Sequence, residues 1–235
     1  MSSREIEDPV LGILGEMGTE ATINFQQELL AETPAETDQD HIVTLVSNDP
    51  KIPDRNAAIR DGSDSPLPRL QINAITLEES GADVIAMPCN TAHYYYDDLK
   101  SNIEADFINM IQTASTTLEQ NGVERVGLLA TKTVLDVGIY DSYFANSSVD
   151  LVAPEDRSRL MEAIYAVKRG DHREATQTLS PVIEYFEHRD CEALLIGCSD
   201  LSVLSIESEL TEYDPITLLA RESVEQLNER EVFSR

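Results

Sequence analysis

Short apolar runs alternate with longer amphipathic stretches along this chain of 235 residues, and this alternation limits the fold more than any other feature. Apolar runs bounded by turn residues predict buried strands, whereas apolar residues repeated every three or four positions predict helices. Strands that alternate with helices form βα units, whose strands pair in parallel in a sheet that helices cover. We therefore predict an α/β fold with parallel sheets.

The predicted elements repeat along the chain. The expected strands are 10–14, 41–47, 84–87, 125–130 and 193–197. The expected helices are 19–31, 70–80, 157–169, 173–188 and 217–231, with proline-containing loops at 48–55 and 62–68. The segment VLGILGEMGT (10–19) is similar in character to RVGLLATKT (125–133), and VIAMPCNTA (84–92) to LLIGCSDLS (194–202). This repeat predicts two pseudo-symmetric α/β subdomains with the active site in the cleft between them.

The charge balance argues against two classes of partner. Asp and Glu number 44 against 17 for Lys and Arg, which gives a formal net charge of -27. A surface this negative repels phosphate backbones and anionic lipids, so we expect no nucleic-acid and no membrane partner. The acidic residues are spread along the chain, which favours adaptation to a salt-rich, halophilic cytoplasm over an acidic tail. The start, MSSREIEDP, lacks the basic and apolar regions of a signal peptide, and we expect a soluble cytoplasmic protein.

Two of the three cysteines stand at corresponding places in the two halves. Cys89 and Cys198 each follow a predicted strand directly, and ligands bind beyond the carboxyl ends of strands in parallel α/β sheets. A helix N-terminus at that place lowers the pKa of a thiol and offers N–H donors to an oxyanion. Cys191 precedes a strand, so we expect a buried, inert thiol there, and no pair has the CxxC spacing of a zinc site.

Two thiols that face each other across a cleft suit the inversion of a carbon stereocentre. A thiolate removes a proton from one face of the carbon while a thiol returns one to the other face. The carbanion needs hydrogen-bond donors around the neighbouring carboxylate, and Asn90, Thr91 and Ser199 are candidates. No pyridoxal-phosphate lysine is required for this chemistry. The residues alone therefore indicate a two-base proton transfer.

The motifs also resemble a known family. The segments that carry the resemblance are GILGEMGTEAT (12–22), DQDHIV (38–43), NDPKIPDRNAAI (48–59), GADVIAMPCNTAHYYYDDL (81–99), VGLLAT (126–131) and LLIGCSDL (194–201). Together they are similar to the aspartate/glutamate racemase superfamily, and most similar to its cofactor-independent aspartate racemases. This resemblance implies a small dicarboxylic amino acid as substrate, no cofactor, no metal and a homodimer. It also implies a subdomain of residues 1–115 completed by the C-terminal helix (213–235), and a second subdomain of residues 116–212.

The resemblance assigns roles to individual residues. The two catalytic cysteines of the family fall on Cys89 and Cys198, and its IPDR arginine and a basic residue before the second cysteine fall on Arg55 and Lys168. Those two cations also make sense alone, because a dicarboxylate bound by an acidic protein needs local positive charge. The candidate substrate-binding residues are Met17, Arg55, Asn90, Thr91, Ala92, Thr131, Lys168 and Ser199.

Several positions depart from the family pattern. Glu16 stands where the family usually has glycine, Asn56 replaces a threonine, and Ser199-Asp200 replaces Thr-Glu. The turn after the fourth predicted strand loses hydroxyls at Val134 and Val137, which are expected near the substrate. These departures favour a substrate other than aspartate or a weak catalyst.

Three alternative functions therefore stay open at this point. The chain could be an epimerase or isomerase of another carboxylate, a cysteine hydrolase that uses Cys89 with His93, or a binding protein without turnover. A Cys–His pair four residues apart shares a helix face, although a packing role for His93 is the more common outcome. The glycines Gly12, Gly15 and Gly18 have GxxGxxG spacing rather than GxGxxG, which argues against a dinucleotide cofactor.

Overall fold

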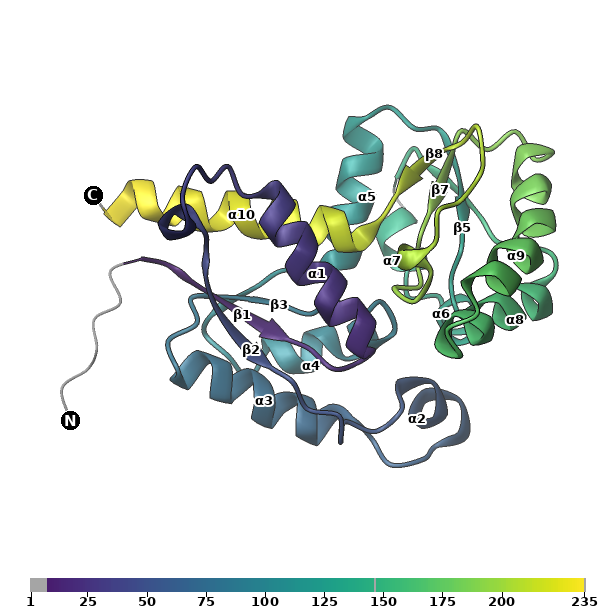
Figure 1. The fold of residues 1–235 in the computed structure, drawn as a ribbon. Helices are drawn as coiled ribbons and strands as arrows, with labels where there is room; N and C mark the ends of the chain where they lie inside the picture. The colour runs from purple at the N-terminus through teal and green to yellow at the C-terminus, as the bar shows by residue number, and fades with distance from the viewer. Residues whose placement is uncertain (1–7, 146, 235) are drawn as a thin grey trace.

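Two parallel sheets, each of four strands, form the frame of the molecule (Figure 1). The computed structural model describes residues 8–145 and 147–234. The first sheet contains β1 (Val10–Leu14), β2 (Val43–Ser47), β3 (Val84–Ala86) and β4 (Asp106–Phe107). The second contains β5 (Arg125–Leu128), β6 (Asp150–Val152), β7 (Ala193–Leu195) and β8 (Thr211–Tyr213). The predicted α/β class with parallel sheets in two halves is confirmed.

The two sheets have the same strand order. Along the first sheet the order is β2-β1-β3-β4, and along the second it is β6-β5-β7-β8. Every pair within a sheet is parallel, with β1 and β3 in the centre of one sheet and β5 and β7 in the centre of the other. The strands that precede the two cysteines, β3 and β7, therefore occupy equivalent places. This correspondence explains the repeat in the sequence.

Helices cover both sheets. The first half holds α1 (Thr19–Glu32), α2 (Arg55–Asp61), α3 (Leu67–Glu79), α4 (Tyr96–Lys100) and α5 (Met110–Gln120). The second half holds α6 (Lys132–Val137), α7 (Asp141–Phe144), α8 (Arg157–Lys168) and α9 (His172–Glu187), and α10 (Pro215–Ser234) ends the described chain. Short 3₁₀ helices are η1 (Asp38–Asp40), η2 (Thr91–Tyr95) and η3 (Leu201–Val203).

The two loops expected at 48–55 and 62–68 are partly helical. Asp54 accepts a hydrogen bond from the Ala57 N–H at 2.7 Å and so caps α2, a helix that the sequence did not indicate. The next helix, α3, begins at Leu67 and takes Pro68 into its first turn, where the missing N–H of proline costs no hydrogen bond. Of the two helices, α2 contacts η2, which follows β3, and α6 of the second half.

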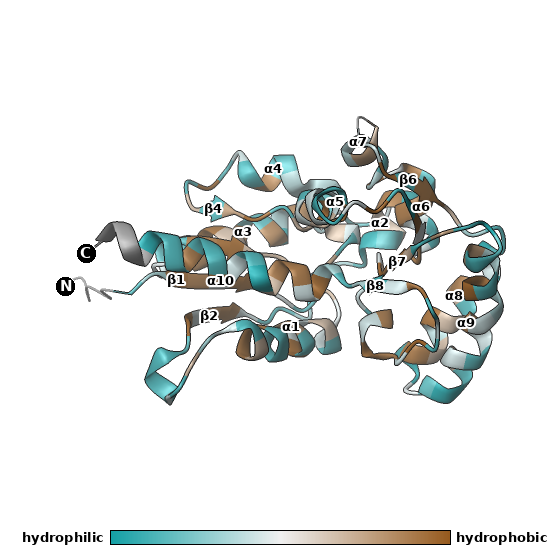
Figure 2. Cartoon of the chain, turned by 90° about the horizontal axis from the view of Figure 1, so that it is seen from above, coloured by the Kyte–Doolittle hydropathy of each residue, from teal (hydrophilic) through white to brown (hydrophobic). Residues whose placement is uncertain are grey.

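The buried side chains are mostly apolar. Figure 2 shows most of the strands in the hydrophobic colour, whereas the helices around them carry both hydrophobic and hydrophilic residues. The last helix, α10, packs against α1 and α5 and buries Ile216, Leu219 and Val224 with residues of the first sheet (Figure 1). The expected boundary between residues 115 and 116 falls inside α5, so the two halves share this helix. The exact limits of the subdomains stay a prediction.

In the described residues, no helix has both the length and the apolar composition that crossing a membrane requires. Residues 1–7, on which most of the expectation about a signal peptide rests, lie outside the described residues. The predicted location in the cytoplasm stays an expectation.

Candidate active site

A cavity of about 210 Å³ holds both candidate cysteines. Cys89 follows the end of β3 and Cys198 follows the end of β7, so equivalent strands of the two halves deliver one thiol each to the same space. The thiols are almost fully buried, with exposed fractions of 5% and 4%. Drug-sized ligands occupy pockets of about 300–1,000 Å³, so this smaller cavity suits a ligand of amino-acid size.

The residue before Cys198 must be small. A Cβ atom on Gly197 would lie 2.6 Å from Leu128 Cδ1 and 3.0 Å from Ala130 Cβ. Only glycine lets the chain pass this closely over the neighbouring strand β5 and place Cys198 at the cavity.

Cys89 contacts a backbone carbonyl to which an arginine also donates. Its Sγ atom lies 3.7 Å from the carbonyl oxygen of Met17, to which the thiol donates. The guanidinium of Arg55 donates to the same carbonyl at 2.7 Å and to the Pro53 carbonyl at 3.2 Å. Arg55 Nε is buried and has no partner in the described structure. Arg55 therefore holds the loop that touches Cys89 and keeps a donor available at the cavity.

The surroundings of Cys198 are charged. Its Sγ atom lies 3.7 Å from Asp200 Oδ2, and the same oxygen forms an ion pair with Lys168 Nζ at 2.7 Å. Burial, and then the negative charge of Asp200, raise the pKa of the Cys198 thiol. Burial opposes the charge of Lys168, but its hydrogen bond to Asp200 and the charge of that carboxylate outweigh burial and raise the pKa of Lys168. Burial and Asp200 therefore favour the protonated form of Cys198.

Asn90 joins the two halves and presents a free donor. Its side chain is 2% exposed, and its Oδ1 accepts a hydrogen bond of 2.5 Å from the hydroxyl of Tyr140, which belongs to the second half. Asn90 belongs to the lining of the cavity, and its Nδ2 atom is buried without a partner in the described structure. A buried amide donor without a partner is costly unless a ligand accepts from it. Tyr140 is a site residue that the sequence did not indicate, because nothing in its local pattern shows that it reaches Asn90.

His93 has a structural role. Its Nδ1 contacts the Cys89 carbonyl oxygen at 2.9 Å, and its Nε2 accepts from the Met110 N–H at 3.1 Å. These two contacts require the neutral ring with a proton on Nδ1, and burial lowers the pKa of His93 to about 4. Both ring nitrogens are therefore bound to the backbone, and neither is hydrogen-bonded to the Cys89 sulfur. The hydrolase alternative thus lacks the general base on which it depends.

Most of the predicted substrate-binding residues meet at the cavity. Those on its lining are Met17, Arg55, Asn90, Thr91, Thr131, Lys168 and Ser199. Ala92 is the exception, because it is completely buried and packs among apolar side chains of the first half. Ala92 is not among the residues that line the cavity, so its contact with a substrate stays a prediction.

Three of the departures from the family pattern, Glu16, Val134 and Val137, lie away from the lining, whereas Asn56, Ser199 and Asp200 belong to it. Glu16 adopts a positive φ of 62° and accepts a hydrogen bond from the Thr19 hydroxyl at 2.9 Å, outside the cavity. Val134 packs in the core of the second half, and Val137 is 40% exposed on the surface. Hydroxyls reach the cavity instead from Thr131 and Thr133. Because Val134 and Val137 are not among the lining residues, the structure gives no support to the expected loss of substrate contacts there.

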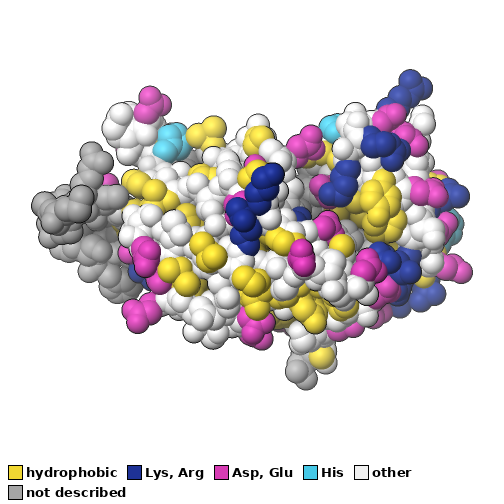
Figure 3. Space-filling view, turned by 90° about the horizontal axis from the view of Figure 1, so that it is seen from below, with side chains coloured by type: hydrophobic (Ala, Val, Ile, Leu, Met, Phe, Trp, Pro, Cys, Tyr) yellow, Lys and Arg dark blue, Asp and Glu magenta, His cyan; other side chains and the backbone are white. Residues whose placement is uncertain are grey.

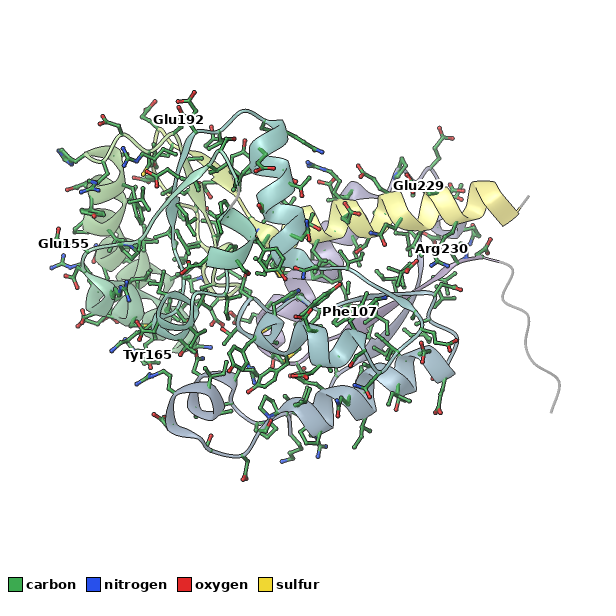
Figure 4. The ribbon with its side chains drawn as sticks, turned by 180° about the vertical axis from the view of Figure 1, so that it is seen from behind. Phe107, Glu155, Tyr165, Glu192, Glu229 and Arg230 are labelled. Atoms are coloured by element: carbon green, nitrogen blue, oxygen red, sulfur yellow. The ribbon has the colours of Figure 1, made fainter. Side chains whose placement is uncertain are left out.

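Other lining residues were not predicted as site residues, although Asn56 and Asp200 had been noted as departures from the family pattern. They are Asp54, Asn56, Arg60, Lys132, Thr133, Met161, Ile164, Tyr165 and Asp200. Asp200 could have been suspected from its place two residues after Cys198. Tyr165 lies on α8 on the side that faces α2, a relation that only the packed helices reveal (Figure 4).

The cavity is locally basic in an acidic protein. Four cations, Arg55, Arg60, Lys132 and Lys168, line it together with the carboxylates of Asp54 and Asp200. On the face drawn in Figure 3, basic side chains gather over the middle of the molecule and over the second half, and acidic side chains are scattered.

A larger groove of about 590 Å³ near Phe107, Glu229 and Arg230 lies at the far end of the molecule from Tyr165 (Figure 4). Within residues 8–145 and 147–234 no cluster of three His, Cys, Asp or Glu side chains could hold a metal ion.

The comparison with protein families agrees with this geometry. Residues 14–222 match the family model described as Asp/Glu/Hydantoin racemase. Because the match covers most of the chain, the protein belongs to this family. It is thus an enzyme of the isomerase class, an amino-acid racemase by family.

Individual relatives cover nearly the whole chain. The solved structure of Picrophilus torridus aspartate racemase is 32% identical, covers 94% of each chain and has a TM-score of 0.87. The broad specificity amino-acid racemase RacX of Bacillus subtilis is 25% identical over 234 residues, which span 92% of this chain and 96% of RacX. A putative Asp/Glu racemase from Yersinia pestis shares the fold at 20% identity, with a TM-score of 0.80 over 94% of this chain and 99% of its own.

Proposed function

We propose that this enzyme interconverts the enantiomers of an acidic amino acid, aspartate in the first place, by proton transfer at the α-carbon between Cys89 and Cys198. The observation that carries the proposal is the single cavity of about 210 Å³ that both thiols border, one from each half. The family membership and the name of the Picrophilus relative support the reaction and the substrate.

In the proposed reaction, the two cysteines act on opposite faces of the α-carbon. Because burial and Asp200 favour the protonated form of Cys198, we expect Cys198 to be the acid and Cys89 the base in the first turnover. Cys89 first releases its thiol proton to solvent; as a thiolate it then takes the α-proton, and Cys198 gives its proton to the other face. The two residues have then exchanged protonation states, which prepares them for the reverse direction.

We expect the hydrogen-bond donors and cations on the cavity lining to bind the two carboxylates of the substrate. The unpartnered Nδ2 of Asn90 and the hydroxyl of Ser199 are suited to the α-carboxylate, whose charge grows as the proton leaves. Arg55 and Lys168 add positive charge for a second carboxylate. The broad specificity of RacX makes other amino acids worth testing beside aspartate.

Exchange of the α-proton with solvent tests the proposal directly. Single enantiomers of aspartate, glutamate, alanine and asparagine are incubated with the enzyme in D₂O under reducing conditions and at high salt, which the acidic composition favours. Proton NMR follows the loss of the α-proton signal, and chiral chromatography follows the product. We expect Cys89→Ser and Cys198→Ser each to reduce the rate of racemisation by about 10²–10⁴-fold.

Cys191→Ser is the matched control. This third thiol is also buried but packs in the core of the second half, outside the cavity, so its loss should leave the rate unchanged. The proposal fails if the wild-type enzyme exchanges no acidic amino acid, or if either cavity cysteine can be replaced without loss of rate.

A further inference from the structure

We propose that His93 is a positioning residue that fixes the peptide group of Cys89 against the start of α5, and so sets the place of the Cys89 thiol relative to Cys198. The inference rests on the proposed function and deepens it, because it names a residue on which the proton transfer depends. His93 is not among the residues that line the cavity, so it acts through Cys89 and not on the substrate.

The ring of His93 is held on both sides. It is 6% exposed and stacks on Tyr96, with ring centroids 5.9 Å apart and an angle of 6° between the planes. Because the Met110 N–H donates to Nε2 at 3.1 Å, the neutral ring carries its proton on Nδ1 and donates to the Cys89 carbonyl at 2.9 Å. Burial lowers the pKa of His93 to about 4, so the ring stays neutral at neutral pH. One rigid ring therefore joins the Cys89 carbonyl to the backbone of α5.

The helix α5 belongs to both halves of the molecule. Met110, its first residue, packs with α10 and residues of the first sheet, whereas Ile111 and Ala114 pack in the core of the second half. The Met110 N–H is thus a point whose position depends on both halves. A link from Cys89 to this point fixes Cys89 relative to the half that carries Cys198.

The two cysteines are held in different ways. The carbonyl of Cys198 accepts from the Leu201 N–H at 2.9 Å, so the backbone of its own turn supplies the donor. At Cys89 a side chain four residues further along supplies the donor, and the same ring reaches Met110, another 17 positions away. A substitution of His93 can therefore release the Cys89 peptide and leave the turn of Cys198 intact.

Two substitutions separate the two contacts of the ring. The side chain of His93→Asn ends at the place of Nδ1 and keeps a donor for the Cys89 carbonyl. The side chain of His93→Gln reaches the place of Nε2, where its amide oxygen keeps an acceptor for the Met110 N–H. Both variants lose the ring and its packing on Tyr96, so a merely structural role predicts similar losses in the two.

Racemisation of aspartate, followed by chiral chromatography, gives the first readout. We expect kcat to fall by about 10- to 100-fold in His93→Gln and by less than about threefold in His93→Asn, because a small displacement of a reacting group slows the reaction strongly. KM should change by less than about twofold in both variants, since neither substitution touches the lining of the cavity.

Amide hydrogen exchange of the substrate-free enzyme, measured by mass spectrometry, gives a readout without turnover. In His93→Gln the segment 89–93 should exchange about 2- to 10-fold faster, because the Cys89 peptide has lost a hydrogen bond. In His93→Asn the start of α5 around Met110 should exchange faster instead. His188→Gln is the matched control, since His188 Nδ1 contacts the carbonyl of Glu184, also four residues earlier, at 2.6 Å but in an exposed place at the end of α9. It should change neither kcat nor the exchange of the two segments.

Three results would overturn the inference. They are an equal loss of kcat in His93→Asn and His93→Gln, an unchanged kcat in His93→Gln, and an exchange of segment 89–93 in His93→Gln equal to that of the wild type. A folded His93→Asn whose kcat has fallen by about tenfold or more would also overturn it, even if His93→Gln did not fold. If the wild type racemised no acidic amino acid, the proposed function would be refuted, and the exchange pattern would still decide whether His93 holds the Cys89 peptide.

Discussion

The hydrogen bond from the Tyr140 hydroxyl to Asn90 Oδ1 is the contact whose removal tests the site most sharply. Tyr140 is 1% exposed and Asn90 2%, so water does not replace the lost donor easily. Tyr140→Phe deletes one oxygen atom and keeps the ring beside Phe144. The buried Asn90 oxygen is then left without a donor.

The expected cost follows from this burial. A buried acceptor without a partner costs about 1–3 kcal/mol in the free energy of unfolding. For a domain of this size, 1 kcal/mol corresponds to a change in Tm of about 2–4 °C, so the Tm of Tyr140→Phe should fall by about 2–12 °C. Release of Asn90 should also let its amide turn away from the proposed substrate, and we expect kcat/KM to fall by about tenfold.

Tyr143→Phe is the matched control. The Tyr143 hydroxyl accepts a hydrogen bond from Asn109 Nδ2 at 2.7 Å, but this pair is only partly buried, so water can take the place of the lost oxygen. Its removal should cost less than about 1 kcal/mol and leave kcat/KM unchanged. Thermal unfolding and racemisation assays measure both variants. If Tyr140→Phe proved as stable and as active as Tyr143→Phe, the assignment of a structural and positioning role to the bond between the halves would be refuted.

Two further predictions concern protonation. Because burial lowers the pKa of His93 to about 4 from 6.5, the unfolded chain binds its proton first, and stability present above pH 6.5 is lost as the pH falls towards 4. Chemical denaturation should show that His93→Gln loses less unfolding free energy than the wild type as the pH falls. An identical pH dependence of the two proteins would contradict this. Burial raises the pKa of Asp214 to about 6, so Asp214 contributes with the opposite sign in both proteins. Asp200→Asn should lower the pKa of Cys198 by removing a neighbouring negative charge. The absorbance of the thiolate measures this pKa in a protein that also carries Cys89→Ser and Cys191→Ser, so that Cys198 is the one remaining cysteine. A pKa that rises or stays constant would exclude this role of Asp200.

Structural features that depend on a local sequence pattern could be predicted from the sequence. Buried strands such as β1 and β5 appear as apolar runs, and the cysteines that follow β3 and β7 can be placed at one edge because parallel strands end together. The strands β4, β6 and β8 were missed because each has only two or three residues and lies away from the centre of its sheet. Such short segments carry too little pattern to distinguish them from loops.

Contacts between distant parts of the chain could not be predicted from the sequence. The bond from Tyr140 to Asn90 spans 50 positions, and the contact between α2 and α6 depends on how two short helices pack. Val134 and Val137 were interpreted from a motif, yet the turn of α6 directs them elsewhere. The homodimer implied by the resemblance stays a prediction.

The position of α10 has a consequence for synthesis on the ribosome. This helix covers α1 and part of the first sheet, yet it is made after all eight strands. While the chain is still growing, the residues around Phe25 and Leu29 lack their cover, so α1 reaches its final packing only after α10 has been made. An emerging chain with such a gap is prone to self-association, and its yield in cells should depend on chaperones that shield the uncovered side until residues 215–234 arrive.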